Sequence, residues 1–282
     1  DSQLLITLQT TSKGLSLLAM ALGLSYPFHK IFYANGGMGK LFDDMLKDID
    51  VRKSEEIKYI KKERDFYRLI STKNEYLSSK VVLNAPVFEC SEIFLDEDIK
   101  NYYKKFEFYD QSAFVIYLKI DSQKEFLNHY QIILKDTIPN SVSKSFFVSF
   151  SHKDDEKLSK NGYSVTISFH TKALFWSNLS KDEYETKKEF TKNFIIDELL
   201  KNISDIKIED IKIEFCATSK TFKRYINRFN CGSTPLNLKN IFKIPSSTTP
   251  FKNLYNIGDS VFAGQGWPGV ALGVKVLNQN LI

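Results

Sequence analysis

The 282-residue sequence is poor in cysteine, glycine, proline and long apolar runs, and each shortage excludes a class of protein. Its three cysteines, Cys90, Cys216 and Cys231, have no close partner along the chain, so we expect neither a disulfide framework nor a thiolate metal site, and a reducing compartment is the simpler interpretation. With only 12 glycines and 7 prolines, the chain is neither collagen-like nor of low complexity. The longest uncharged stretch, between Lys13 and Lys30, is shorter than the ~20 residues of a membrane span, so no transmembrane helix is expected.

The charged side chains also lack the patterns of several common functions. The net charge is +5, but Lys and Arg are mixed with Asp and Glu along the chain, so no nucleic-acid partner is predicted. The four histidines show no H-E-x-x-H or paired spacing, and no serine lies in G-x-S-x-G. We therefore expect no metal site, no zinc hydrolysis and no serine-esterase chemistry. His170, at the end of a predicted strand, is kept as a candidate for lining a cavity.

The residues that are present predict a globular protein with both helices and strands. Hydrophobic residues make up 43% of the chain, and its length is about twice the ~100–150-residue mode of one domain, so two packed units or one large unit are expected. Residues 15–22 are apolar on most sides, which predicts a buried helix. Further helices are predicted over 38–49, over 181–202 behind a Ser180–Glu183 capping box, and over 268–281.

Strand-like spacing occupies two parts of the sequence. Two strands with a hairpin turn at 71–74 are predicted within 55–78, followed by a fully buried strand over 80–86, and residues 88–105 are mixed and weakly helical. Period-2 segments predict an antiparallel sheet that forms the floor of a second domain. They lie at 114–120, 130–134, 145–150 and 163–170, and strand-like spacing resumes over 206–215.

Glycine is concentrated at 36–39 and again at 258–273, although it is scarce elsewhere. Residues 264–269 satisfy G-x-G-x-x-G, but we reject a dinucleotide fingerprint because no second strand and no acidic residue about 20 positions on can follow it. A helix that begins at Pro268–Gly269 presents free N–H groups to an anionic or electron-rich ligand atom. Asp259 follows an apolar strand, and from spacing alone it is equally well a ligand-binding carboxylate or a turn former.

A family resemblance adds to these observations. Residues 249–273 resemble the carboxy-terminal flavin motif of the phytoene desaturase and carotenoid isomerase family, with the pattern TP-x-x-x-LY-x-x-GDS-x-x-x-GQG-x-PGVALG. Residues 36–41 look like its GGM-x-x-L element, and residues 81–86 look like the strand that re-enters its FAD domain. Weaker similarities are Phe222-x-x-Tyr225-x-x-Arg228 and residues 233–236.

The resemblance implies an α/β fold, of mixed α+β character, with an incomplete FAD-binding Rossmann-like domain and a substrate domain built on a mainly antiparallel sheet with helices. The expected ranges are 1–30 for a helical part of the substrate domain, 31–90 for an FAD-domain segment, 91–230 for the substrate-binding domain and 231–282 for the carboxy-terminal FAD-domain segment.

The resemblance also implies which residues bind the cofactor FAD. The expected residues are Ile57, Gly258, Asp259, Gly266, Trp267, Gly269 and Val270. The backbone of Gly269 and Val270 would cap the pyrimidine edge of the flavin, and Asp259 would hold its ribityl or pyrophosphate portion. Trp267 would face the isoalloxazine region, and Ile57 would pack near the adenine. Because the flavin supplies the chemistry, no catalytic side chain is assigned.

The expected function is that of the carboxy-terminal part of an FAD-dependent oxidoreductase that acts on a long apolar polyene, such as a carotenoid desaturase or isomerase, with hydride transfer to the flavin. A flavin amine oxidase and a non-catalytic binding protein on the same fold are the alternatives. The family opens with a strand, a GxGxxG turn and a helix, which this sequence lacks, and the chain begins with Asp1. We therefore expect a portion of a longer flavoprotein that by itself binds FAD weakly or not at all.

The expected partner is an apolar small-molecule substrate, and the sequence does not determine the oligomeric state. The expected location is cytoplasmic or at a membrane periphery. Peripheral membrane contact is expected only because such a substrate would be lipid-soluble.

Overall fold

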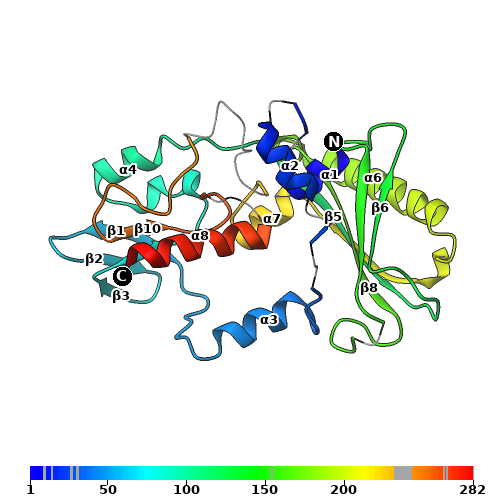
Figure 1. Cartoon of the computed structure of the whole chain (residues 1–282), viewed down its shortest axis with the longest axis horizontal. Coiled ribbons are helices and arrows are strands. Elements are labelled where there is room, and N and C mark those ends of the chain that lie inside the picture. Colours follow the sequence, from blue (N-terminus) through cyan, green and yellow to red (C-terminus); the bar gives the residue numbers. More distant parts are fainter. Residues whose placement is uncertain are drawn as a thin grey trace. The chain divides into compact units, whose positions relative to one another are not determined.

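The computed structural model describes residues 1–8, 11–13, 15–25, 28–29, 32–153, 155–231, 243–262, 264 and 266–281 (Figure 1). The chain divides into two compact units. Unit 1 comprises Asp1–Thr11, Gly23–Ile49 and Asp110–Cys231, and unit 2 comprises Ser12–Leu22, Asp50–Tyr109 and Gly232–Ile282. Each unit is therefore assembled from three separate stretches of sequence.

Unit 1 is built on a five-stranded sheet with the strand order β6-β7-β8-β5-β9, in which all neighbours are antiparallel. The strands are β5 (Ser112–Ile120), β6 (His129–Ile133), β7 (Ser145–Phe150), β8 (Tyr163–Thr171) and β9 (Ile211–Ala217). The antiparallel sheet predicted from period-2 spacing is thus confirmed. The expected strand over 206–215 begins later than predicted, because a 3-10 turn at Ile208–Asp210 precedes β9.

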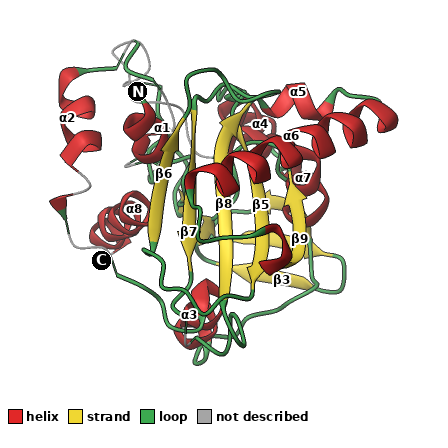
Figure 2. Ribbon diagram, turned by 90° about the vertical axis from the view of Figure 1, so that its right-hand side faces the viewer, coloured by secondary structure: helices red, strands yellow, loops and turns green. Residues whose placement is uncertain are grey.

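One face of this sheet is covered by helix α6 (Lys181–Asn202), which crosses the strands in Figure 2. The inward side chains of the strands and of α6 form one apolar core, to which Phe114, Ile167 and Leu199 contribute. Trp176 of α5 (Ala173–Ser177) is fully buried in this core, and its Nε1 donates a hydrogen bond to Thr171 Oγ1 at 2.9 Å. Unit 1 also contains α1 (Ser2–Leu8), α3 (Gly37–Leu46) and α7 (Ser219–Ile226).

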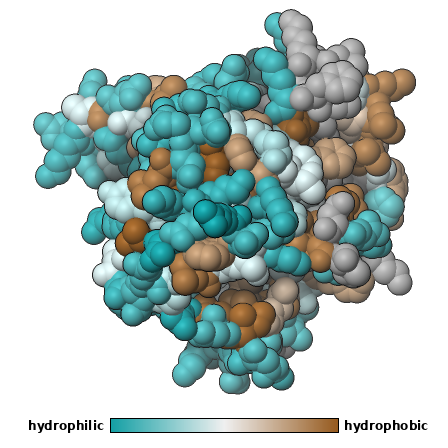
Figure 3. Space-filling view, turned by 90° about the vertical axis from the view of Figure 1, so that its left-hand side faces the viewer, coloured by the Kyte–Doolittle hydropathy of each residue, from teal (hydrophilic) through white to brown (hydrophobic). Residues whose placement is uncertain are grey.

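Unit 2 contains two small sheets and its own core. Strands β1 (Ile57–Lys62), β2 (Tyr67–Ser71) and β3 (Glu75–Ser78) form an antiparallel sheet, and β4 (Val81–Leu83) pairs in parallel with β10 (Leu254–Asn256). Short 3-10 turns at Val87–Glu89 and Ser91–Ile93 lead into α4 (Glu97–Tyr103), and the unit ends with α8 (Gly266–Leu281). Its buried residues include Ile60, Tyr67, Phe94, Tyr103 and Leu254. Figure 3 shows a mostly hydrophilic face on which apolar atoms form separate patches.

Two expectations about burial are wrong. The predicted apolar helix is present as α2 (Leu17–Ser25), but Leu17, Leu18, Leu22 and Leu24 are all at least half exposed, so the helix is not buried within this chain. The predicted buried strand is only the three-residue β4, and Val82 at its centre is 41% exposed. An all-apolar sequence does not specify which neighbour covers it, and within this chain little covers these side chains.

The fold class itself is confirmed, because helices, a mainly antiparallel sheet and a parallel strand pair occur together. The residue ranges given above for units 1 and 2 come from the structure. The assignment of residues 1–30, 31–90, 91–230 and 231–282 to flavin-binding and substrate-binding domains stays a prediction.

Candidate functional site

The ends of the parallel strands β4 and β10 bring two distant stretches of sequence together in unit 2. Ile257 N donates to Leu83 O at 2.8 Å, which continues the ladder past the last residue of β10. Gly258 then has a φ of +107°, and a Cβ at this position would lie 2.7 Å from Asn84 Oδ1. Only glycine fits without strain, because its φ is positive and the Asn84 side chain already fills the space. The carboxyl ends of parallel strands are a usual place for ligands.

The turn after Gly258 is fastened to the segment that follows β4. Ser260 Oγ accepts a hydrogen bond from Val87 N at 3.2 Å, and the Val261 side chain is 1% exposed in the core of unit 2. Gly264 N donates to Val261 O at 2.7 Å, which closes a second turn. Asp259 lies half-buried between Gly258 and Ser260, so its carboxylate is held at a fixed strand end.

Asn256, the last residue of β10, carries a buried donor at the same strand end. Its side chain is fully buried, and its Oδ1 accepts a hydrogen bond from Tyr103 OH at 2.6 Å. Burial raises the pKa of Tyr103 above its usual range, so the phenol stays protonated and donates. Asn256 Nδ2 has no hydrogen-bond partner among the described residues. A buried donor without a partner costs about 1–3 kcal/mol, so the position of Asn256 Nδ2 opposes the stability of this strand end.

Helix α8 presents an open first turn. Gly266, Trp267 and Pro268 are exposed, whereas Gly269 and Val270 are half-buried, and Leu277 anchors the helix in the protein at 3% exposure. The first N–H groups of a helix have no intrahelical acceptor and carry the positive end of its dipole. The first turn of α8 therefore has donors from which an electron-rich or anionic group could accept, and its role toward a ligand stays a prediction.

All seven predicted cofactor-binding residues lie in unit 2. Gly258 and Asp259 lie at the strand end, and Gly266, Trp267, Gly269 and Val270 form the first turn of α8. Ile57 begins β1 in the other sheet of the unit, where it packs partly against the same core. Their roles toward a flavin stay predictions. Asn84 and Asn256 were not predicted as site residues. The available signal was a polar residue at the end of a short apolar segment, directly after β4 for Asn84 and as the last residue of β10 for Asn256. Residues 233–236 lie outside the described residues.

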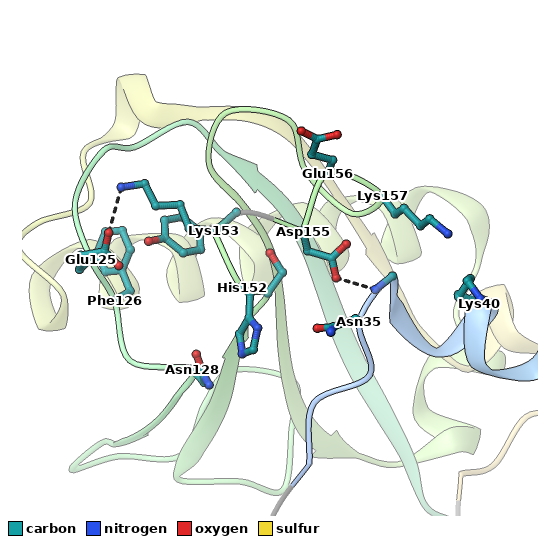
Figure 4. A pocket seen from close by; sticks show the side chains of 13 residues that line it. Asn35, Lys40, Glu125, Phe126, Asn128, His152, Lys153, Asp155, Glu156 and Lys157 are labelled. Carbon is teal, nitrogen blue, oxygen red and sulfur yellow. Dashed lines mark hydrogen bonds and ion pairs between the residues drawn. The ribbon is translucent and has the colours of Figure 1, made fainter.

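The glycines at 36 and 37 have a structural explanation in unit 1. Gly36 N donates to Asp155 Oδ2 at 2.6 Å (Figure 4), and Tyr33 OH donates to the same oxygen at 2.8 Å. Both glycines have positive φ, and a Cβ on Gly37 would lie 2.8 Å from Leu158 Cδ2. These glycines thus let the start of α3 approach the loop that contains Asp155.

A cavity of about 800 Å³ lies beside this contact, with Asn35, Asn128, His152 and Lys157 among its lining residues in Figure 4. Lys153 at its rim pairs with Glu125 at 2.9 Å. Its charged side chains are of both signs, so it shows no preference for a ligand of one charge.

The face of the unit 1 sheet opposite α6 carries half-buried polar and aromatic side chains in rows across the strands. The register places Tyr117, Thr166, Ser149 and His129 in one row. A second row contains Val115, Ser168, Phe147 and Gln131, and Ala113 lies opposite His170 at the end of the sheet.

His170, the candidate histidine from the sequence, thus lies on the half-buried face of the sheet. Burial lowers the pKa of His170 to about 4, so the imidazole is neutral at physiological pH.

No group of three or more His, Cys, Asp or Glu side chains in the described ranges is arranged to hold a metal ion. Within the same ranges, none of the helices has the length and apolar character to cross a membrane.

The fold is that of a group of oxidoreductases and isomerases of known structure. An oxidoreductase from Methanosarcina mazei matches 99% of this chain and 63% of its own with a TM-score of 0.64 and 16% sequence identity. A CLA-producing fatty acid isomerase from P. acnes matches 96% of this chain and 57% of its own, with a TM-score of 0.57 and 12% identity. At these identities the likeness concerns the fold alone.

The curated relatives are more specific. A chloroplastic prolycopene isomerase of an Oncidium hybrid cultivar is 33% identical over 131 residues, which are 45% of this chain and 22% of that protein. The corresponding protein of Daucus carota is 32% identical over 131 residues, 45% of this chain and 21% of its own length. The match thus spans about a fifth of the curated relatives. No protein-family model matches the chain. The predicted resemblance to the carotenoid isomerase family is confirmed.

Proposed function

We propose that this chain is the carboxy-terminal, flavin- and substrate-contacting part of an FAD-dependent enzyme that acts on a long apolar polyene, as a carotenoid desaturase or isomerase does. The observation that carries the proposal is the 131-residue match to prolycopene isomerases at 33% identity. The fold shared with oxidoreductases and isomerases of known structure supports it. The strand-end cluster of unit 2, which consists of Gly258, Asp259 and the first turn of α8, supplies groups suited to a flavin.

The residues of the strand-end cluster fit the parts of FAD. Asp259 would accept a hydrogen bond from a ribityl hydroxyl, and the first-turn N–H groups near Gly269 and Val270 would donate to the pyrimidine edge. Bound flavin would supply the redox chemistry by accepting a hydride, and the side chains of this chain would only position it.

The half-buried face of the unit 1 sheet is the surface we assign to the substrate. It presents the rings of Tyr117 and Phe147 and the small side chains of Thr166 and Ser168. His170 on this face is uncharged at physiological pH because burial lowers its pKa to about 4. A largely uncharged, half-buried face suits an apolar chain better than an ionic substrate, because a buried charge without a partner is costly.

Weak flavin binding by the chain is best tested with glycine amides as reporters. The protein would be labelled with 15N in its 12 glycines, and FAD would be added while their amide resonances are followed by NMR. We expect the signals of Gly258, Gly264, Gly266, Gly269 and Gly273 to shift. Those of Gly36, Gly37 and Gly162 in unit 1 should not shift.

Asp259→Ala should weaken the apparent affinity for FAD by about tenfold, because it removes one charge-assisted hydrogen bond. The glycine signals should therefore shift less at the same FAD concentration. The control is Asp43→Ala, which removes an exposed carboxylate from α3 in unit 1. Absence of any shift at millimolar FAD, or equal shifts in the Asp259→Ala protein, would contradict the proposed flavin site. The flavin amine oxidase and binding-protein alternatives remain hypotheses that a polyene turnover assay would separate from this proposal.

A further inference from the structure

A second concave surface lies at the β9 edge of the unit 1 sheet, where α6 and α7 flank the strand (Figure 2). Its cavity measures about 640 Å³, within the range of ~300–1,000 Å³ that is usual for small-molecule sites. The walls are Tyr184, Glu185 and Lys188 of α6, residues 215–217 of β9, and the face of α7 that carries Lys220 and Arg224. Tyr117, whose ring centre lies 4.8 Å from that of Phe215, also lines the cavity, so the cavity adjoins the sheet face assigned above to the substrate.

Three cations converge on this cavity. The Nζ atoms of Lys188 and Lys220 lie 5.4 Å and 4.9 Å from the centre of one ring, that of Tyr184. This ring is buried and fixed, because Tyr184 OH and Thr218 Oγ1 are hydrogen-bonded at 3.0 Å. Arg224 follows Lys220 by four residues and therefore shares its face of α7.

The positive charge of the cavity is not balanced by protein carboxylates. No ion pair joins Lys188, Lys220 or Arg224 to a carboxylate in the described part of the chain. Lys192, one turn further along α6, has two such partners, Glu189 at 2.7 Å and Glu214 at 2.8 Å.

Glu185 is the single carboxylate among the described residues that line the cavity, and with Lys188, Lys220 and Arg224 it leaves a net charge of +2 there. Like charges around one ring repel, and an anion would relieve this repulsion.

Exposed aromatic side chains also line the cavity. Phe215 of β9 is 57% exposed, and Tyr225 of α7 is 74% exposed, with the Arg224 guanidinium 5.5 Å from its ring centre. Stacking of a flat ring on such side chains contributes about 1–3 kcal/mol in nucleotide-binding proteins. A dianionic phosphate matches the net charge of the cavity, and an attached aromatic ring matches its exposed faces.

We propose that the cavity between α6, β9 and α7 binds an organic phosphate monoester that carries an aromatic ring, of the kind found in a nucleoside monophosphate. The phosphate lies between Lys188, Lys220 and Arg224. The ring stacks on Phe215 or Tyr225. This proposal is independent of the flavin site in unit 2.

Isothermal titration of the full chain with three probes tests the proposal. Guanosine 5′-monophosphate should bind at least about tenfold more tightly than either inorganic phosphate or guanosine, since each of these carries only half of the recognised groups. Lys188→Glu and Arg224→Glu should each weaken binding of the nucleotide by about tenfold or more. Phe215→Ala should weaken binding of the nucleotide but not that of inorganic phosphate.

The matched control is Lys181→Glu, the same charge reversal at an exposed position at the start of α6, outside the cavity. It should leave the dissociation constant unchanged, and circular dichroism should show that every variant is folded. Absence of saturation at about 1 mM nucleotide would overturn the proposal. The proposal would also be overturned if the Lys188→Glu and Arg224→Glu proteins both bound the nucleotide as tightly as the unaltered chain. Equal weakening by the control Lys181→Glu would overturn it too, because either result would place the nucleotide elsewhere.

Discussion

At the scale of single residues, the backbone at Gly258 specifies glycine. Its φ is +107°, and a Cβ would lie 2.7 Å from Asn84 Oδ1. Gly258→Ala should therefore lower the free energy of unfolding by about 1–3 kcal/mol, measured by urea denaturation. Gly39→Ala is the control, because α3 leaves open space within 4 Å of that position, and alanine favours helix by up to about 1 kcal/mol. Equal losses in the two variants would contradict this account of Gly258.

His170 gives the protein a pH-dependent contribution to stability. Burial lowers its pKa to about 4 in the folded protein, against about 6.5 in an unfolded chain. The unfolded chain therefore binds more protons between these values, and stability should fall as the pH decreases from about 6.5 to about 4. His170→Gln should reduce this slope by up to about 1.4 kcal/mol per pH unit, measured by urea denaturation at several pH values. Ser168→Ala, on the same sheet face, should leave the slope unchanged.

At the scale of elements, the start of α6 depends on a capping box that was predicted from Ser180 and Glu183. Ser180 Oγ accepts from Glu183 N at 3.4 Å, and Ser180 N donates to Glu183 Oε2 at 3.1 Å. Ser180→Ala should cost about 0.5–2 kcal/mol of unfolding free energy, because α6 covers the core of unit 1. Ser180→Thr keeps the cap and should lose much less. Equal losses in the two variants would mean that the cap hydrogen bonds do not stabilise the helix.

At the scale of the whole molecule, two separate cores predict two unfolding transitions. Trp176 is fully buried in the core of unit 1, and Phe94 is fully buried in that of unit 2. In a Trp267→Phe background Trp176 is the sole tryptophan, so its fluorescence reports unit 1. Phe94→Ala should destabilise unit 2 by about 3–5 kcal/mol. The part of the unfolding transition that belongs to unit 2, followed by circular dichroism, should then shift. The fluorescence midpoint should stay in place, and a common shift of both signals would show that the units unfold as one.

Local patterns in the sequence determined most helices and strands. The period-2 segments gave the strands of the large sheet, the capping box gave the start of α6, and the glycine-rich motif gave the start of α8 within two residues. These features depend on residues that are close in sequence, where side-chain periodicity and capping hydrogen bonds act. The same motif carried the family resemblance, because its residues lie in one continuous segment.

Only the tertiary structure decided which distant segments meet. The pairing of β4 with β10, the approach of Gly36 to Asp155 and the convergence of α6 and α7 on one cavity join residues far apart in sequence. The exposure of α2 was also decided at this level, since an apolar segment is buried only where a neighbour covers it. Local propensity carries no information about such partners, because burial and long-range hydrogen bonds depend on how the whole chain packs.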